Sequence, residues 1–169
     1  PPLLVLYFSI KNKLFRNLLL LVASIFFYAW GEPVYVFLMI ASIIINYFFG
    51  LLIDGSATHA RRKFFTLLGT AVNVLILMHF KYTDFIIENM NLLLALEIDA
   101  KEIPLPIGIS FYTFQAISYL VDIYRGDVKA QRSLLKMGLY ISFFPQLIAG
   151  PIVKYHDIEQ QLENRTVTP

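Results

Sequence analysis

The chain has 169 residues, of which 57% are hydrophobic and only 15% are charged, and its mean hydropathy is +0.63. Because soluble domains carry about 25% charged residues, this composition is typical of a membrane protein. The net charge of +2 and the placement of Lys and Arg in short runs between apolar blocks argue against a nucleic-acid-binding surface. With no cysteine, a disulfide framework, a thiolate nucleophile and a Cys-ligated metal are excluded.

The two ends of the sequence indicate a fragment. It begins at Pro1 rather than Met, residues 3–10 resemble the tail of a helix, and no terminal element follows Thr168. We therefore expect residues 1–169 to be a single integral-membrane region cut from a longer chain.

Five apolar segments predict helices embedded in a membrane. A run of about 18 or more apolar residues without charge is typical of a membrane-spanning helix, and residues 34–53 are the clearest case. The predicted fold class is therefore all-α, a polytopic transmembrane helical protein. The other four segments are 18–30 (extending back over Leu14), 64–80, 103–121 and the broken 137–153.

Two connections refine this organisation. Gly31, Glu32 and Pro33 predict a tight turn with Pro33 at the start of the next helix, so that residues 14–53 form a helical hairpin. Residues 82–96 alternate apolar and polar side chains and are too short and polar to span a membrane. We expect them to form a separate amphipathic helix at the outer interface.

The positive charges orient the predicted helices. If each helix crosses the membrane once, three basic groups fall on one side, which the positive-inside bias assigns to the cytoplasm. Glu32 and the acidic residues between 84 and 102 fall on the opposite side. The three groups are Lys11, Lys13 and Arg16; Arg61, Arg62 and Lys63; and Arg125, Lys129 and Arg132.

A polar stripe runs along the fourth segment. Tyr112, Gln115, Tyr119 and Asp122 follow i, i+3, i+7, i+10 spacing, which places them on one face of a helix. Because polar groups inside a bilayer are costly unless they face protein or water, we expect this face to point away from lipid. It either lines a substrate path or forms a packed interface between helices, with Asp122 at the membrane edge beside Arg125.

The fifth segment is interrupted in a way that a simple spanning helix does not need. Pro145, Gly150 and Pro151 break the apolar run 142–157, and Gln146 adds a polar group to it. Irregular backbone at membrane depth is tolerated when it is buried in protein or lines a water-filled cavity. The segment is thus a candidate part of a substrate path near the polar stripe, or else a bent interfacial helix.

The histidines offer no clear catalytic base. His59 lies in a basic loop, where we expect it to be solvated, and His79 lies at the end of an apolar segment beside Lys81. His156 is followed by Asp157, but adjacent residues on a helix point about 100° apart and do not form a base and its orienting partner. No zinc spacing, Gly-rich phosphate loop or Ser-centred elbow is present.

Two asparagines lie inside predicted helices. Asn46 and Asn73 fall in the second and third apolar segments. Amide side chains at such positions bond between helices, so we expect them to join these two helices.

Four motifs, in this order, resemble the amino-terminal half of the membrane-bound O-acyltransferases. They are "RNLLLLVASIFFYAWGEP", "FKY", "LPIGISFYTFQAISYLVDIYRGD" and "FFPQLIAGPIVKYHDIEQQL". The likeness covers essentially the whole chain and is closest to the bacterial alginate O-acetyltransferase branch, with teichoic-acid D-alanyl transfer proteins as near relatives. His79 departs from the apolar or aromatic residue usual before "FKY" in that family.

The resemblance implies a multi-helix fold, in the bacterial cell membrane, with a tunnel through which an acyl group passes from a cytoplasmic donor to an outer acceptor. The family's catalytic histidine lies beyond residue 169, so we expect no catalytic residue in this chain and no activity from it alone. The implied donor is acetyl-CoA or an acyl-carrier protein, with no cofactor or metal bound. The remaining carboxy-terminal half, and an extracytoplasmic acetyl-transfer protein, are the implied partners.

Three alternatives remain open at this point. The chain could serve D-alanyl transfer to teichoic acid instead of acetyl transfer to a polysaccharide. It could be part of a transporter that binds a solute at the polar stripe and the broken segment, although no internal repeat is visible. It could also be a membrane scaffold that binds a partner enzyme without catalysis.

Overall fold

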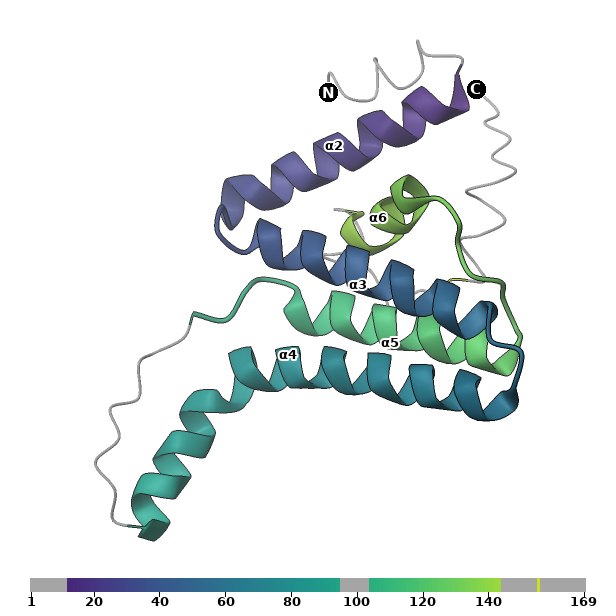
Figure 1. Ribbon diagram of the computed structural model, residues 1–169. Coiled ribbons are helices and arrows are strands. Elements are labelled where there is room, and N and C mark those ends of the chain that lie inside the picture. The colour runs from purple at the N-terminus through teal and green to yellow at the C-terminus, as the bar shows by residue number, and fades with distance from the viewer. Residues whose placement is uncertain (1–11, 95–103, 144–154, 156–169) are drawn as a thin grey trace.

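The structure, a computed structural model, describes residues 12–94, 104–143 and 155. Within these ranges the chain forms five helices and no strand, which confirms the predicted all-α class (Figure 1). In chain order the helices are α2 (Lys13–Gly31), α3 (Val36–Asp54), α4 (His59–Leu94), α5 (Ile109–Arg125) and α6 (Leu134–Ser142).

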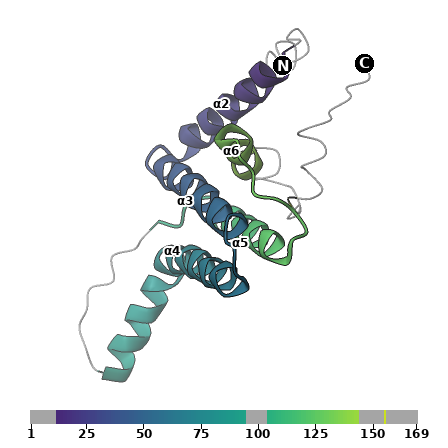
Figure 2. The same ribbon diagram turned by 45° about the vertical axis from the view of Figure 1, so that its right-hand side comes forward.

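Helix α3 lies at the centre of the assembly. It packs against α4, α5 and α6, while α4 and α5 also pack against each other and α2 packs mainly against α6. Figures 1 and 2 show α3, α4 and α5 stacked side by side, with α2 and α6 on the opposite side of α3 from α4. The core between them contains fully buried Met39, Tyr119 and Met137.

The distribution of side chains is the reverse of that in a soluble protein. Large apolar side chains cover the outside, as Trp30 (81% exposed) and Phe37 (70% exposed) illustrate, whereas Ser42, Asn46 and Asn73 are buried. Among the described residues, three helices are long and apolar enough to cross a membrane, at Leu14–Gly31, Val36–Asp54 and His59–Leu93. Helices α5 and α6, with 17 and 9 residues, are shorter and more deeply packed.

The predicted hairpin between the first two long helices is present. The chain turns after Gly31, and α3 begins at Val36, three residues after Pro33. The Val36 amide nevertheless donates to the Glu32 carbonyl (3.1 Å), so helical winding already starts at Pro33. Proline suits this position because its missing N–H would have no partner inside the helix.

The expectation of two separate helices in this part of the chain is wrong, because α4 is continuous. Residues 64–80 and the expected interfacial helix 82–96 belong to one helix of 36 residues as far as Leu94, because no Pro or Gly interrupts the chain there. The Thr83 and Asn89 side chains bond to carbonyls four residues earlier, an interaction that bends helices. Figure 1 shows α4 bent, with its C-terminal part leaving the other helices.

Helix α5 is shifted relative to the predicted segment 103–121. Pro104 and Pro106 precede it, and Gly108 (φ 75°) holds a left-handed conformation just before Ile109. At the other end Gly126 (φ 83°) ends the helix, with its amide bonded to the Ile123 carbonyl. A left-handed glycine after the last turn is a common helix stop, and the sequence "YRGD" carries that signal.

Helix α6 is the beginning of the broken segment predicted at 137–153. It starts earlier, at Leu134, because Ser133 caps it by accepting a hydrogen bond from the Lys136 amide. The helix ends at Ser142, and Phe143 has ψ 106°, outside the helical region. The positions Pro145, Gln146, Gly150 and Pro151 lie outside the described residues.

The described members of the three basic groups lie toward one end of the helices. An Arg62 guanidinium nitrogen donates to the Ile123 carbonyl (2.8 Å), and the Tyr47 hydroxyl donates to the Arg132 carbonyl (3.0 Å). These bonds join the start of α4, the end of α5 and the loop that follows α5. Helix α2 runs opposite to α3, so the start of α2 lies toward this same end, on the right of Figure 1. Within the described residues, the grouping expected from the sequence is present in the fold, and Lys11 lies outside them.

Candidate functional site

The polar stripe of α5 faces the protein interior. Tyr112 (1% exposed), Gln115 (5%), Tyr119 (0%) and Asp122 (8%) are all buried, whereas Phe114 on the other side of the helix is 50% exposed. This burial confirms the prediction that the stripe points away from lipid. The bonds described next show which neighbouring elements the stripe contacts.

Gln115 joins α5 to the end of α6. Its side-chain Nε2 donates to the Tyr140 carbonyl (2.8 Å), and the Tyr140 hydroxyl lies 3.4 Å from the Gln115 carbonyl oxygen. The last four carbonyls of a helix have no partner within that helix, and Tyr140 is among them because α6 ends at Ser142. Gln115 therefore stabilises the point at which the chain leaves its helical path.

Three buried tyrosines form a cluster beside Gln115. The rings of Tyr119, Tyr140 and Tyr155 pack together with centroid separations of 5.0 to 6.3 Å, and all three are at most 2% exposed. We call them the tyrosine cluster. Rings that meet edge to face at such distances add stabilisation beyond their buried area.

Gln131 ties the loop after α5 to the tyrosine cluster. Its backbone amide donates to the Tyr119 hydroxyl (2.9 Å), and its side-chain Nε2 donates to the Tyr155 hydroxyl (2.6 Å). Its Oε1 accepts a hydrogen bond from the backbone amide of Ser133 (3.0 Å). Ser133 is the residue that caps α6. One glutamine thus fixes the loop, the start of α6 and Tyr155.

Gly50 of α3 allows the tyrosine cluster to pack closely. A Cβ atom at this position would lie 2.7 Å from the Tyr119 hydroxyl oxygen and 3.0 Å from a ring carbon of the same residue. Sequence reasoning missed Gly50, Gln131, Tyr140 and Tyr155. The available signal was a lone glycine inside an otherwise bulky apolar helix, which often marks close packing.

The two ends of the stripe have different surroundings. Tyr112 lies beside Tyr28 of α2, whose hydroxyl donates to the Ile107 carbonyl (3.0 Å). Asp122 lies in the last turn of α5, where Arg125 is exposed. The stripe thus runs from the α2–α3 turn region to the basic end of the helices.

Asn46 and Asn73 form a second buried polar contact, which we call the asparagine pair. Asn46 Nδ2 donates to Asn73 Oδ1 (3.1 Å), and Asn73 Nδ2 donates to Asn46 Oδ1 (2.8 Å). Both residues are at most 2% exposed. The predicted bond between the second and third apolar segments is confirmed, and it joins α3 to α4.

The two histidines within the described residues lie away from the polar stripe. His79 is exposed and packs against Phe80, as expected for an interfacial position. His59 is exposed too, and its Nε2 lies 3.1 Å from the Tyr124 hydroxyl. His156 lies outside the described residues. In the described part of the chain, no three His, Asp or Glu side chains group as metal ligands would.

The fold and these contacts define a class: a multi-pass helical membrane protein with an apolar exterior and an interior held by polar bonds. No family model and no solved structure matches the chain significantly. Curated proteins match nearly the whole chain. The chain is 39% identical to a probable alginate O-acetylase AlgI of Pseudomonas syringae pv. tomato and 38% identical to that of Pseudomonas aeruginosa, in each case over 99% of this chain.

A relative named for a different acceptor polymer extends the comparison. The chain is 36% identical, over 92% of its length, to a peptidoglycan O-acetyltransferase of Helicobacter pylori. The chain spans about a third of the length of these relatives, between 33% and 34%. The resemblance to polysaccharide O-acetyltransferases that the sequence motifs indicated is confirmed over nearly the whole chain.

Proposed function

We propose that the chain is part of a membrane-bound O-acyltransferase that moves an acetyl group across the membrane to hydroxyl groups of an extracytoplasmic polysaccharide. One observation carries the proposal: relatives along nearly the whole chain are named for O-acetylation of two different polymers, alginate and peptidoglycan. Acetyl is favoured over D-alanyl because the relatives reported above are named for acetylation. The polymer itself is not specified by this likeness.

In this proposal the buried polar stripe and the broken segment lie along the wall of the acyl path. The support is energetic, since an unpaired amide or hydroxyl in an apolar medium costs a few kcal/mol, and the Gln115 amide and the Tyr119 hydroxyl are bonded inside the protein. The bond from Gln115 to the end of α6 holds the chain where the broken segment begins. The path residues are Tyr112, Gln115, Tyr119, Asp122, Pro145, Gln146, Gly150 and Pro151.

The proton acceptor for the transfer is expected outside residues 1–169. Among the described histidines, His59 and His79 are exposed, and they contact Tyr124 and Phe80 rather than a residue of the stripe. The acyl donor, acetyl-CoA or an acyl-carrier protein, would approach from the cytoplasm. The rest of the enzyme, and an extracytoplasmic transfer protein, would complete the route.

The proposed orientation places the basic ends of the helices in the cytoplasm of a bacterial cell. The co-location of the basic groups at one end of the fold supports this orientation. Residues 1–169 contain no cysteine, so in a complete protein whose other cysteines are replaced, one cysteine introduced here is the only labelling site. Glu32→Cys should react readily and Lys63→Cys only after permeabilisation; the reverse pattern would invert the orientation. Lys63 is exposed, whereas Arg62 is engaged with α5.

The experiment that tests the function uses the complete gene product. The gene is deleted in its host, and ester-linked acetate released by mild alkali from each purified surface polysaccharide is measured. Deletion should remove acetate from one polymer and complementation should restore it. Unchanged acetylation of every polymer, together with loss of solute uptake or of D-alanyl ester, would overturn the proposal in favour of a transporter or a D-alanyl transferase. Residues 1–169 alone should show no transfer.

A further inference from the structure

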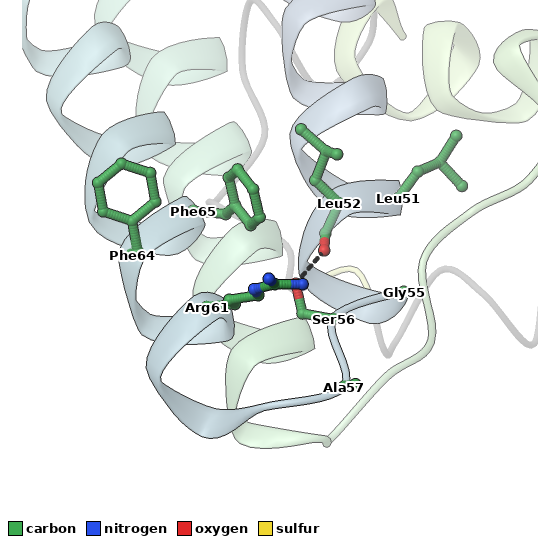
Figure 3. A pocket seen from close by; sticks show the side chains of 8 residues that line it. All are labelled: Leu51, Leu52, Gly55, Ser56, Ala57, Arg61, Phe64 and Phe65. Carbon is green, nitrogen blue, oxygen red and sulfur yellow. Dashed lines mark hydrogen bonds between the residues drawn. The ribbon is translucent and has the colours of Figure 1, made fainter.

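A groove lies at the basic end of the helices, and none of the residues that line it belongs to the polar stripe. It has a volume of about 570 Å³ and opens between the last turn of α3 and the first turns of α4 (Figure 3). The groove is lined by Leu51, Leu52, Gly55, Ser56, Ala57, Arg61, Phe64 and Phe65.

The lining combines apolar walls with one cation. Leu51 and Leu52 from α3 and Phe64 and Phe65 from α4 supply the apolar side chains, and Figure 3 shows Arg61 reaching from α4 toward the end of α3. Among the lining residues there is no carboxylate, since Asp54 is not one of them. The groove therefore attracts an anion at one point and apolar groups elsewhere.

Arg61 is the donor available to a ligand. It is exposed, and in the described part of the chain its guanidinium is engaged in no hydrogen bond or ion pair. The other polar side chain of the lining, Ser56, already donates its hydroxyl proton to the Leu52 carbonyl (2.6 Å). A bound molecule must therefore present its anionic group to Arg61.

The surroundings of the groove are those of a membrane boundary. Lys63 and Arg125 lie exposed at the same end of the helices. Toward the middle of α3 and α4 the surface turns apolar, with Phe48 58% and Leu67 60% exposed. A molecule in the groove thus has its charged end among cations and its remainder beside the apolar helix faces.

We propose that this groove binds an anionic phospholipid from the surrounding leaflet. The phosphate bonds to the Arg61 guanidinium, which suits phosphate because its donors form a planar fork. An acyl chain lies along Leu52 and Phe64. Basic pockets between membrane helices bind anionic headgroups in this way. A free phosphate would make no contact with the apolar walls. A lipid without a net negative charge would not pair with the positive charge of Arg61.

The test measures lipid retained by the purified complete protein. The protein is exchanged into nanodiscs containing phosphatidylglycerol, phosphatidylcholine or mixtures, and bound lipid is counted by native mass spectrometry after release. The expected result is one retained phosphatidylglycerol per protein, with Arg61→Gln lowering its affinity about tenfold, as for loss of a charge-assisted bond. Phe64→Ala should also reduce retention.

Matched controls separate the groove from general attraction. Lys63→Gln removes the same charge two residues away from Arg61, and Leu67→Ala shortens a side chain as exposed as Phe64, both 60%; neither residue lines the groove. Both variants should leave retention near that of the parent protein. Equal loss in Arg61→Gln and Lys63→Gln, equal retention of phosphatidylcholine, or displacement by glycerol phosphate alone would overturn the proposal. Unchanged melting temperatures would show that each variant is folded.

Discussion

Two buried polar regions of this protein are built in different ways. In the asparagine pair between α3 and α4, each amide donates to the other and accepts from it. In the tyrosine cluster and its two glutamines, one bond joins two side chains, Gln131 and Tyr155, and the other bonds each include a backbone group. Gln115 donates to the Tyr140 carbonyl, and the Gln131 amide donates to the Tyr119 hydroxyl.

This difference separates two roles. The asparagine pair is closed, because its donors and acceptors satisfy each other and the neighbouring carbonyls of Ser42 and Gly69. Its loss should loosen two helices without moving a loop. The tyrosine cluster is attached to the end of α6 and to the loop after α5, so a change there alters where the chain goes next. We expect stability to depend on both regions and transfer activity mainly on the second.

The largest expected effect is that of Gln115→Leu on transfer activity. The substitution leaves the Tyr140 carbonyl buried without its donor and releases the end of α6. A displacement of about 1 Å at a reacting group lowers the rate by up to about a hundredfold, so acetate transfer by the complete gene product should fall by about tenfold or more. Ester-linked acetate on the acceptor polymer, at equal protein expression, is the measurement.

Ile117→Leu is the control for that prediction. Ile117 is partly exposed on the other side of α5, so this change alters shape without removing a polar bond. Its activity should stay near that of the parent. If the two variants transfer acetate equally at equal expression, the stripe has no role in the path and is a packing interface alone.

The next effect in size concerns the packing of the tyrosine cluster on α3. Gly50→Ala places a Cβ 2.7 Å from the Tyr119 hydroxyl oxygen, and overpacking of this kind costs about 1–3 kcal/mol. The melting temperature of the purified protein should fall by several degrees. Gly31→Ala, where a Cβ meets nothing within 4 Å, should leave it nearly unchanged. Equal melting temperatures for both variants would contradict the close contact.

The sequence predicted the helices and the inward side of α5 because both follow from periodicity and the cost of desolvation. It also predicted the asparagine pair, because amides in apolar helices need partners and Asn46 and Asn73 stood alone in neighbouring segments. Each of these inferences depends on one element or on two adjacent ones. That is the range over which local pattern is informative.

The sequence did not predict the partners in the tyrosine cluster. Gln131 and Tyr155 are 24 residues apart, and Gln115 and Tyr140 are 25 apart, so their contact depends on how α6 folds back. The acceptor of Gln115 is a carbonyl, which every residue has, and residue type therefore gave no signal. The continuity of α4 was missed because a change from apolar to amphipathic composition was interpreted as a boundary, although no helix-breaking residue marks one.

The smallest expected effect is on stability, and it tests whether the two amides of the asparagine pair satisfy each other. Asn46→Leu or Asn73→Leu alone leaves the other amide buried without its partner, and each should destabilise the protein by about 1–2 kcal/mol. In the double variant no amide remains unpaired, so its cost should be below the sum of the single costs by about 1 kcal/mol. Unfolding in detergent, followed by helical circular dichroism as denaturant is added, gives the four free energies. Strict additivity would show that the two amides do not depend on each other.

Acetate transfer by the double variant should remain close to that of the parent, and a loss as large as that of Gln115→Leu would erase the distinction between the two regions.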